Sequence, residues 1–166
     1  LIKSYINNKI DQINLNFIEE KKALGSAGAI AYLKTKMTKD FFLINCDTLA
    51  NIDLEKIYKF HKNKKNDLTI IAANKNFSIP YGSCVLNKSG KFEKIVEKKN
   101  YVELINIGMY VFSPKVPKKM KLNSKINMDQ LIKKLKKLKM KIGVFPINEN
   151  SWVDTGTLEN IILKKF

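Results

Sequence analysis

The stretch Phe41-Phe-Leu-Ile-Asn-Cys-Asp47 decides the fold, because a fully apolar run ends there on a polar turn and an acid. Such a short apolar run is typical of a strand that a parallel sheet buries on both faces. The stretch Asp67-Leu-Thr-Ile-Ile-Ala-Ala73 is a second run of this kind. Between the two, residues 53–61 place apolar side chains at helical spacing, which predicts an amphipathic helix with Asp53 as its N-cap.

The rest of the chain extends this pattern. Further helices are expected over residues 1–13, 25–33, 128–138 and 157–166, and further strands over residues 15–18, 84–86, 92–96, 107–112 and 141–147. The first half alternates helices with strands, which predicts a doubly wound α/β fold with a mostly parallel central sheet and helices on both faces. No linker rich in Pro, Gly or Ser interrupts the pattern, so one domain is expected over residues 1–166.

Composition limits the classes of protein to consider. The net charge of the 166 residues is +16, and every basic residue is Lys. Arg, which reads guanine and forks onto phosphate, is absent from the sequence. An AT-rich genome explains so much Lys, Asn and Ile better than a nucleic-acid surface does, so a Lys-rich nucleic-acid-binding module is kept only as an alternative. The apolar runs are far shorter than the roughly 20 residues that span a membrane, so no membrane partner is expected.

Cysteine and histidine usage adds little chemistry. Cys46 and Cys84 form neither a disulfide framework nor a zinc site and are expected to be small buried hydrophobes, which favours a reducing, cytoplasmic location. No secretory leader is recognised. His61, the single histidine, is expected to have a surface or half-buried structural role. The chain begins with Leu1 and not Met, so we expect it to be part of a longer protein.

Two acids are candidate metal ligands. Asp47 directly follows a buried strand, and ligands in open α/β sheets bind outside the carboxyl ends of strands, where a carboxylate suits a hard cation such as Mg²⁺. The alternative is an Asx-turn at the strand exit. Asp154 lies in Ser151-Trp-Val-Asp-Thr-Gly-Thr157, and the alternative for it is a turn that caps the last helix. Sequence spacing alone does not show that the two acids meet.

Two other short motifs have equally open interpretations. Gly25-Ser-Ala-Gly28 opens a helix, where free backbone N–H groups can face a phosphate or a base edge, although it matches neither a P-loop nor a dinucleotide fingerprint. Its Gly-x-x-Gly form also occurs in nucleic-acid-binding loops. Glu97-Lys98 ends a strand, where the carboxylate can accept sugar hydroxyls and the ammonium can hold a phosphate. The alternative is a solvated ion pair.

The order of these motifs is more specific than any one of them. In chain order they are Glu20-Lys-Lys-Ala-Leu-Gly-Ser-Ala-Gly-Ala-Ile30, Phe42-Leu-Ile-Asn-Cys-Asp47, Phe60-His61, Ile79-Pro-Tyr-Gly82, Gly90 with Ile95-Val-Glu-Lys98, Ile105-Asn-Ile-Gly-Met-Tyr110, and Trp152-Val-Asp-Thr-Gly156. From about residue 5 to the end, the chain resembles the sugar-phosphate nucleotidyltransferases (NDP-sugar pyrophosphorylases). It is most similar to the guanylyltransferase-like branch, which includes members with a pair of CBS domains ahead of the catalytic domain.

This resemblance implies a fold of the Rossmann-like, glycosyltransferase-A type and a reaction in which a sugar 1-phosphate and an NTP give an NDP-sugar and pyrophosphate. Mg²⁺ is the implied cofactor, and the resemblance implies that Asp47 and Asp154 hold it. In the implied sugar site, Lys98 binds the sugar phosphate and Glu97 binds sugar hydroxyls, and the pocket is lined by Gly82, Asn106 and Trp152. The residues that would face the base are Glu20, Gly25 and Ser26. An acid at Glu20 could accept from guanine donors, which favours GTP.

The chain also departs from the family pattern. Ser26, Cys46, Lys99 and Ile107 stand where the family usually has Thr, Gly, Pro and Thr. The first strand and the glycine-rich loop, with its Arg and Lys for the triphosphate, are not found in the sequence, so an N-terminally truncated domain with little or no transferase activity of its own is expected. A homo-oligomer is left open. A non-catalytic relative that binds a nucleotide sugar is a further alternative.

Overall fold

The computed structural model describes residues 14–156, and its centre is a four-stranded sheet in the order β1-β6-β3-β7. The strands are β1 (Phe41–Ile44), β6 (Asn100–Phe112), β3 (Leu68–Ser78) and β7 (Ile142–Ile147). β3 and β7 are parallel, whereas β6 is antiparallel to both β1 and β3. Strands β1, β3 and β7 therefore run in one direction and β6 runs against them, so the described sheet is mixed.

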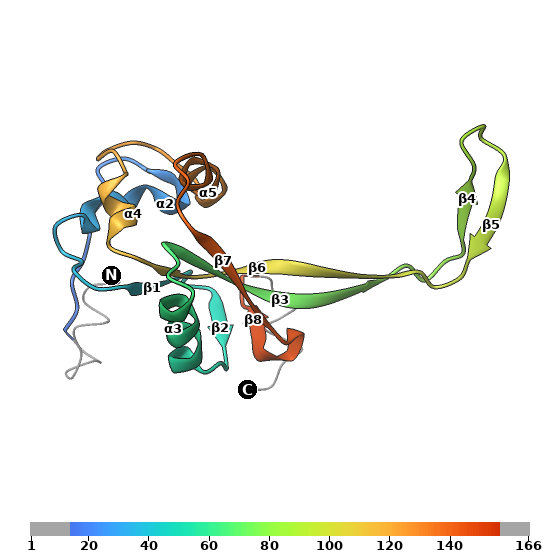
Figure 1. Cartoon of the computed structure of the whole chain (residues 1–166), viewed down its shortest axis with the longest axis horizontal. Helices are drawn as coiled ribbons and strands as arrows, with labels where there is room; N and C mark the ends of the chain where they lie inside the picture. The colour runs from blue at the N-terminus through green and yellow to red at the C-terminus, as the bar shows by residue number, and fades with distance from the viewer. Residues whose placement is uncertain (1–13, 157–166) are drawn as a thin grey trace.

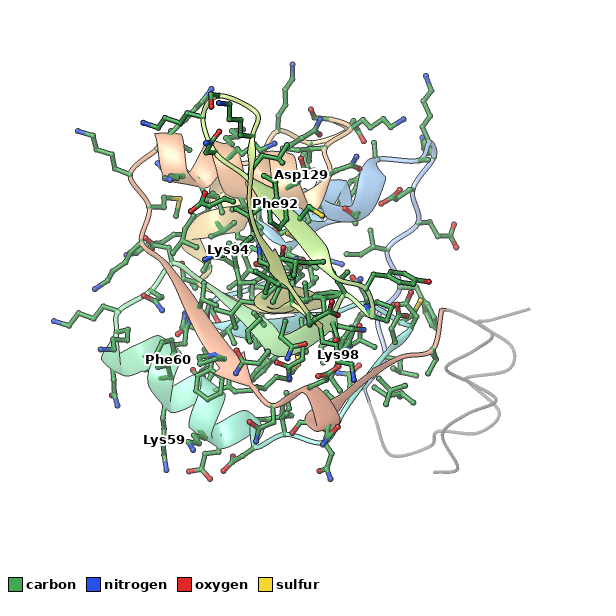
Figure 2. The ribbon with its side chains drawn as sticks, turned by 90° about the vertical axis from the view of Figure 1, so that its right-hand side faces the viewer. Lys59, Phe60, Phe92, Lys94, Lys98 and Asp129 are labelled. Atoms are coloured by element: carbon green, nitrogen blue, oxygen red, sulfur yellow. The ribbon has the colours of Figure 1, made fainter. Side chains whose placement is uncertain are left out.

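Helices cover both faces of this sheet, as the alternating pattern predicts (Figure 1). On one face lie α2 (Gly25–Gly28), the 3₁₀ helix η1 (Ala29–Leu33), α4 (Lys115–Lys118) and α5 (Met128–Lys137). On the other face lies α3 (Leu54–Asn63). In the view along the long axis, Asp129 of α5 is above the sheet and Lys59 and Phe60 of α3 are below it (Figure 2).

The sheet divides the core into two clusters because successive side chains of a strand point to opposite faces. Tyr110 and Phe112 of β6 belong to the cluster under α5, and Met109 and Val111 belong to the cluster over α3. Helix α5 completes the first cluster with Met128, Leu131 and Leu135, which recur at helical spacing and are buried. The lysines of this helix are therefore left on its outer side.

Helix α3 begins as predicted. The Asp53 side chain accepts a hydrogen bond from the Lys56 backbone N–H at 2.9 Å, which satisfies one of the free donors at the helix start. The helix buries Ile57 and His61 against the sheet. His61 is only 1% exposed, so its structural role is fully buried, not on the surface or half-buried as expected.

Strands β3 and β6 continue beyond the sheet as a two-stranded ribbon that carries a second hairpin (Figure 1). The hairpin consists of β4 (Ser83–Leu86) and β5 (Phe92–Val96). We call residues 74–105 the arm. Most of its side chains are exposed, including Tyr81, Phe92 and Val102, because none of the helices within residues 14–156 covers either face of the ribbon.

A small antiparallel pair completes the described chain. Strand β2 (Thr48–Ala50) pairs with β8 (Trp152–Asp154), and the 3₁₀ helix η2 (Glu149–Ser151) leads into β8. This pair lies on the same side of the sheet as α3 (Figure 1). It joins the segment after β1 to the last part of the chain that the structure describes.

Some expectations were wrong. Residues 15–18 form no strand. Cys46 and Cys84 are both free and exposed, because Cys46 lies in the turn after β1 and Cys84 lies on the uncovered hairpin. Strand β1 is half-buried rather than enclosed on both faces. The expected helices over residues 1–13 and 157–166 lie outside the described residues. Within residues 14–156, no helix has the length and apolarity to cross a bilayer.

Candidate active site

A bulge in β6 fixes the loop that carries Asp47. The register of β3 and β6 shifts so that Ile71 is opposite Met109 and Ala72 is opposite Asn106, which leaves residues 107–108 of β6 without counterparts. The Gly108 carbonyl accepts from the Asn45 backbone N–H at 2.9 Å, and the Ile107 carbonyl accepts from the Thr48 hydroxyl at 2.9 Å. The loop from β1 to β2 is thus tied to the bulge at two points.

Glycine is required at this bulge. Gly108 has φ +74°, a left-handed conformation that other residues rarely adopt. A Cβ at this position would also overlap the side-chain amide of Asn45. The Asn106 amide holds the bulge from the other side, since its Oδ1 accepts from the Gly108 N–H at 3.1 Å and its Nδ2 donates to the Tyr110 hydroxyl at 2.7 Å. Burial raises the pKa of Tyr110, against the smaller opposing effect of the Asn106 hydrogen bond, so the phenol stays neutral at pH 7.

The β2–β8 pair brings Asp154 to the Asp47 loop. Thr48 is opposite Asp154 in the register, and both the N–H and the hydroxyl of Thr155 donate to the Asp47 carbonyl, at 2.9 and 3.0 Å. The Gly156 N–H donates to Asp154 Oδ1 at 2.8 Å. A Cβ built on Gly156 would lie 3.0 Å from Asp154 Oδ1 and 3.2 Å from Asp47 Oδ2. The two carboxylates therefore face one point beside Gly156.

This carboxylate pair could provide the protein ligands of a magnesium site. Mg²⁺ prefers oxygen ligands and usually takes one or two protein carboxylates, with waters and substrate phosphates in its other positions. Neither Asp47 nor Asp154 is ion-paired within residues 14–156, so no lysine of that part of the chain neutralises their negative charge. The same part of the chain holds no group of three His, Cys, Asp or Glu side chains that could enclose a metal. The pair fits an open Mg²⁺ site and not a closed structural one.

Trp152 anchors β8 beneath the pair. It is opposite Ala50 in the β2–β8 register, and its ring packs on the core cluster that contains Ile57 and Ile147. Its indole N–H is buried and has no hydrogen-bond partner within the described residues. In this structure Trp152 positions the strand that carries Asp154.

A second group of expected site residues lies on the arm. Glu97 and Lys98 form the turn between β5 and β6, and both are exposed. A Cβ on Gly82 would lie 2.6 Å from Glu97 Oε1, so the Glu97 carboxylate rests against the Gly82 backbone. The part of β6 from Ile107 to Asn100 is about 23 Å long at about 3.3 Å per residue. The turn between β5 and β6, which carries Lys98, is therefore far from the carboxylate pair along the ribbon (Figure 1).

The third group is Gly25 and Ser26 of α2, together with Glu20 ahead of it, and α2 lies on the other face of the sheet, beside α5 (Figure 1). Glu20 Oε2 accepts from the Leu24 N–H at 2.9 Å, and the Ser26 hydroxyl accepts from the Met128 N–H at 2.9 Å. Gly25 has φ +76°, and a Cβ there would lie 2.5 Å from Asn127 Oδ1. Gly25 and Ser26 thus join α2 to the start of α5, whereas Glu20 bonds the backbone just before α2.

The structure thus brings Asp47, Asp154 and Trp152 together, with Asn106 behind them. On the arm it brings Gly82 close to Glu97 and Lys98. These two groups lie apart from each other, and both lie apart from the group at α2. Sequence reasoning missed the positioning residues Asn45, Thr48, Thr155 and Gly156. The one available signal was their place beside the two acids, in turns rich in Asn, Thr and Gly.

Comparisons with known proteins agree on one family. A family model described as Nucleotidyl transferase matches residues 1–164. The chain is 32% identical over 110 residues to the mannose-1-phosphate guanylyltransferase catalytic subunit beta of Xenopus tropicalis, a match covering 63% of this chain and 31% of that protein. It is also 32% identical over 118 residues to mannose-1-phosphate guanylyltransferase 1 of Arabidopsis thaliana, covering 67% of this chain and 33% of that protein. The chain thus spans about a third of the length of these relatives.

A solved structure supports the fold. HddC from Yersinia pseudotuberculosis superposes with a TM-score of 0.69 at 24% identity, over 97% of this chain and 70% of that one. At this identity the likeness concerns the fold, and it confirms the expected Rossmann-like α/β architecture.

Proposed function

The chain belongs to the nucleotidyl transferase family, and on that premise we propose that it carries part of the catalytic domain of a sugar-1-phosphate nucleotidyltransferase. In the proposed reaction, a phosphate oxygen of the sugar 1-phosphate attacks the α-phosphorus of an NTP. The bond from that phosphorus to the bridging oxygen of the β-phosphate breaks, and pyrophosphate leaves. GTP and mannose 1-phosphate are the favoured substrates because both relatives described above are named mannose-1-phosphate guanylyltransferases.

The observation that supports this proposal is the convergence of Asp47 and Asp154 on one point. Phosphoryl transfer of this kind depends on positioning and on neutralising charge. Two carboxylates that have no ion-pair partner among residues 14–156 provide a place for the cation that does so. Bound Mg²⁺ would neutralise and orient the phosphate oxygens. The bulge at Gly108 and the Thr155 hydrogen bonds hold the two carboxylates in place for it.

The other expected roles belong to the same proposal. Lys98 would bind the sugar phosphate as a point charge, and Glu97 would accept hydrogen bonds from sugar hydroxyls beside Gly82. We further propose the following contacts: Asn106 and Trp152 with the sugar, and Glu20, Gly25 and Ser26 with the base. Since the α2 residues make internal hydrogen bonds, a base would have to share or replace them.

A manganese titration tests the carboxylate pair without requiring turnover. Mn²⁺ replaces Mg²⁺ at oxygen sites, and its free concentration is measured by EPR. Asp47→Asn and Asp154→Asn should each weaken Mn²⁺ binding about tenfold or more, because each removes one of two charged ligands. Asp129→Asn is the matched control, since Asp129 is an exposed acid on α5 that pairs with Lys133. Equal binding by all four proteins would refute the metal assignment.

A turnover assay separates the proposal from its alternatives. Pyrophosphate release from GTP and mannose 1-phosphate should depend on Asp47 and Asp154 in the longer protein that we expect, and should be very low for the 166 residues alone. A non-catalytic relative would bind the nucleotide sugar with no release in either form. A Lys-rich nucleic-acid-binding module would present one basic face, whereas blue-tipped side chains point outward on several sides of the described chain (Figure 2).

The remaining expectations are also proposals. We place the reaction in the cytoplasm, in keeping with two cysteines that are free and exposed. A pair of CBS domains in the longer protein and self-association stay predictions. Neither affects the test of the carboxylate pair.

A further inference from the structure

The arm carries an apolar surface that the proposed function leaves unused. Half of the large apolar side chains that are exposed within residues 14–156 lie on the arm. On its terminal hairpin, Leu86 is opposite Phe92 and Cys84 is opposite Ile95. Paired residues share a face of a sheet, and so do residues two apart on one strand, so these four side chains lie on one face. We call them the hairpin face, and each of its three large side chains is more than half exposed.

The sequence of this part of the arm is unusual for the chain. Residues 76–87 contain no charged side chain, although 28% of all residues are charged. Two other uncharged stretches of similar length, residues 23–33 and 104–114, supply buried core side chains. Residues 76–87 are instead exposed or half-buried. Core packing within the described chain therefore does not explain the missing charges, whereas a contact with another molecule does.

Strand β4 also has a free backbone edge. The β4–β5 hairpin is a two-stranded sheet, so β4 has β5 on one side and no strand of the described chain on the other. Proteins usually protect such edges with charged side chains, proline or a bulge. Strand β5 has Glu93, Lys94 and an extra residue in its register, whereas β4 has no charge and no proline. The unprotected strand can therefore pair with a further strand, and a two-stranded hairpin gains stability when it does.

We propose that this further strand is β4 of a second copy of the chain. The two β4 strands pair antiparallel about a two-fold axis at Val85, so that Cys84 of each copy is opposite Leu86 of the other. Such an axis gives a closed contact and limits the assembly to a dimer. The two hairpins become one four-stranded sheet, in which the two hairpin faces join into a single apolar surface.

The charges at the two ends of β4 are complementary in this arrangement. The Glu97 carboxylate rests against the backbone of Gly82, just before β4. Lys88 lies two residues after the end of β4. An axis at Val85 places Lys88 of one copy opposite Gly82 of the other, and thus beside the Glu97 carboxylate of that copy. The dimer contains two such ion pairs, one at each end of the joined strands.

A second copy fits this edge better than a strongly charged partner does. Two copies with a net charge of +16 repel each other over most of their surfaces, but the uncharged β4 edge avoids that repulsion. Since only the hairpins meet, the buried area stays below the roughly 800 Å² per partner of stable complexes, so we expect a dimer that dissociates on dilution. The proposal does not rest on the proposed transferase function. Glu97 keeps a second carboxylate oxygen for a sugar hydroxyl.

Sedimentation equilibrium of the full chain, without substrates, measures the association. Wild type should show a monomer–dimer equilibrium. Leu86→Lys places a charge at the centre of the joined apolar surface and should weaken association about tenfold or more. Val102→Lys is the matched control, because it makes the same kind of change at a similarly exposed position of the arm outside the hairpin. It should leave the dissociation constant almost unchanged.

A charge exchange gives a result that misfolding cannot imitate. Lys88→Glu and Glu97→Lys each bring like charges together at both ends of the dimer, and each should weaken self-association about tenfold or more. An equimolar mixture of the two variants should associate like wild type, because both ion pairs are then restored between unlike copies. Residues 82 and 88 are about 20 Å apart along the strand, so no pair within one copy can give this recovery.

Cross-linking locates the contact. An axis at Val85 puts the two Cys84 residues about 8 Å apart, within reach of a short bismaleimide. Cys46→Ser, which keeps Cys84, should be captured as a dimer, and Cys84→Ser should not. A chain that is monomeric at every concentration, a mixture that does not recover association, or a dimer captured only through Cys46 would overturn the proposal. In the first case the hairpin face would be left for a different protein.

Discussion

Gly108 shows how one residue determines the geometry of the candidate active site. Its φ of +74° and its close approach to the Asn45 amide are separate constraints, and Gly90 offers a comparison that isolates the second. Gly90 has φ +80°, but a Cβ there would meet nothing within 4 Å. The two glycines thus share the backbone constraint and differ in the contact.

We expect Gly108→Ala to lower the free energy of unfolding by about 2 kcal/mol more than Gly90→Ala does, because only the former displaces Asn45. It should also weaken Mn²⁺ binding, since the loop that carries Asp47 is tied to the bulge. Urea unfolding and the EPR titration measure these effects. Equal losses of stability in the two variants would show that the Asn45 contact contributes nothing.

His61 makes stability depend on pH in a definite direction. Burial lowers the pKa of His61 below its ordinary value of 6.5, against the opposing attraction of Asp40, while Lys62 lowers it further and Asp67 raises it. The unfolded chain therefore binds a proton more readily than the folded chain. This contribution to stability is fully present above pH 6.5 and is lost as the pH falls from there towards the folded-state pKa.

The test compares wild type with His61→Gln by urea unfolding at pH 7.5 and 5.5. Wild type should lose stability over this interval at no more than about 1.4 kcal/mol per pH unit from this group. The variant should lose less, even if it is less stable at both pH values. Identical slopes for the two proteins would mean that another group causes the loss.

At the scale of elements, Ser26 has two candidate roles: contact with the base, and a hydrogen bond that stabilises the start of α5. The resemblance assigns this residue to the base, whereas the structure uses its hydroxyl as an acceptor for the Met128 N–H. If that hydrogen bond caps α5, Ser26→Ala should cost about 1 kcal/mol of stability with no nucleotide present. Ser89→Ala, in an exposed turn of the arm, is the control and should cost much less. Thermal unfolding measures both, and an unchanged midpoint for Ser26→Ala would contradict the capping role.

Elements that are specified by a local sequence pattern could be predicted, whereas features that depend on the rest of the fold could not. Helices α3 and α5 and strands β1 and β7 are specified by local spacing of apolar residues, and their predicted bounds are close to those observed. The start of β3 was also predicted, but the strand continues to Ser78, beyond the predicted end at Ala73. Cys46 and Cys84 were misplaced because an apolar neighbourhood in the sequence does not show whether a face is covered. The arm was predicted as strands and turns, but not as a ribbon that leaves the sheet.

The candidate site was less predictable from the residues themselves. Asp47 and Asp154 meet only because β2 pairs with β8, and each of these strands has three residues, too few for a recognisable pattern. Resemblance to a family supplied the link that periodicity could not. The internal bonds of Glu20 and Ser26 depend on partners elsewhere in the fold and were not foreseen.

At the scale of the whole molecule, the separation between the arm and the carboxylate pair constrains the proposed mechanism. Lys98 lies in the turn before β6, beyond the stretch from Asn100 to the bulge that holds Asp47. That stretch alone is about 23 Å long, which is much longer than a hexose 1-phosphate. One substrate can contact both only if the arm bends towards β2 and β8. The arm has no helix on either face in the described chain, so little packing opposes such bending (Figure 1).

The two cysteines are suited to measuring this motion, because Cys46 is next to Asp47, Cys84 is on β4 of the arm, and both are free and exposed. Spin labels on them should give a long distance in the free protein. With Mg²⁺, GTP and mannose 1-phosphate the distribution should shift to shorter distances, because Lys98 is attracted to the sugar phosphate held at the carboxylate pair. Lys98→Ala should bind Mn²⁺ normally but fail to shorten the distance. Substrate binding is verified separately by titration. If the distance in wild type is then unchanged by bound substrates, Lys98 does not act on the ligand held by Asp47 and Asp154. That result would refute the proposed role of the arm.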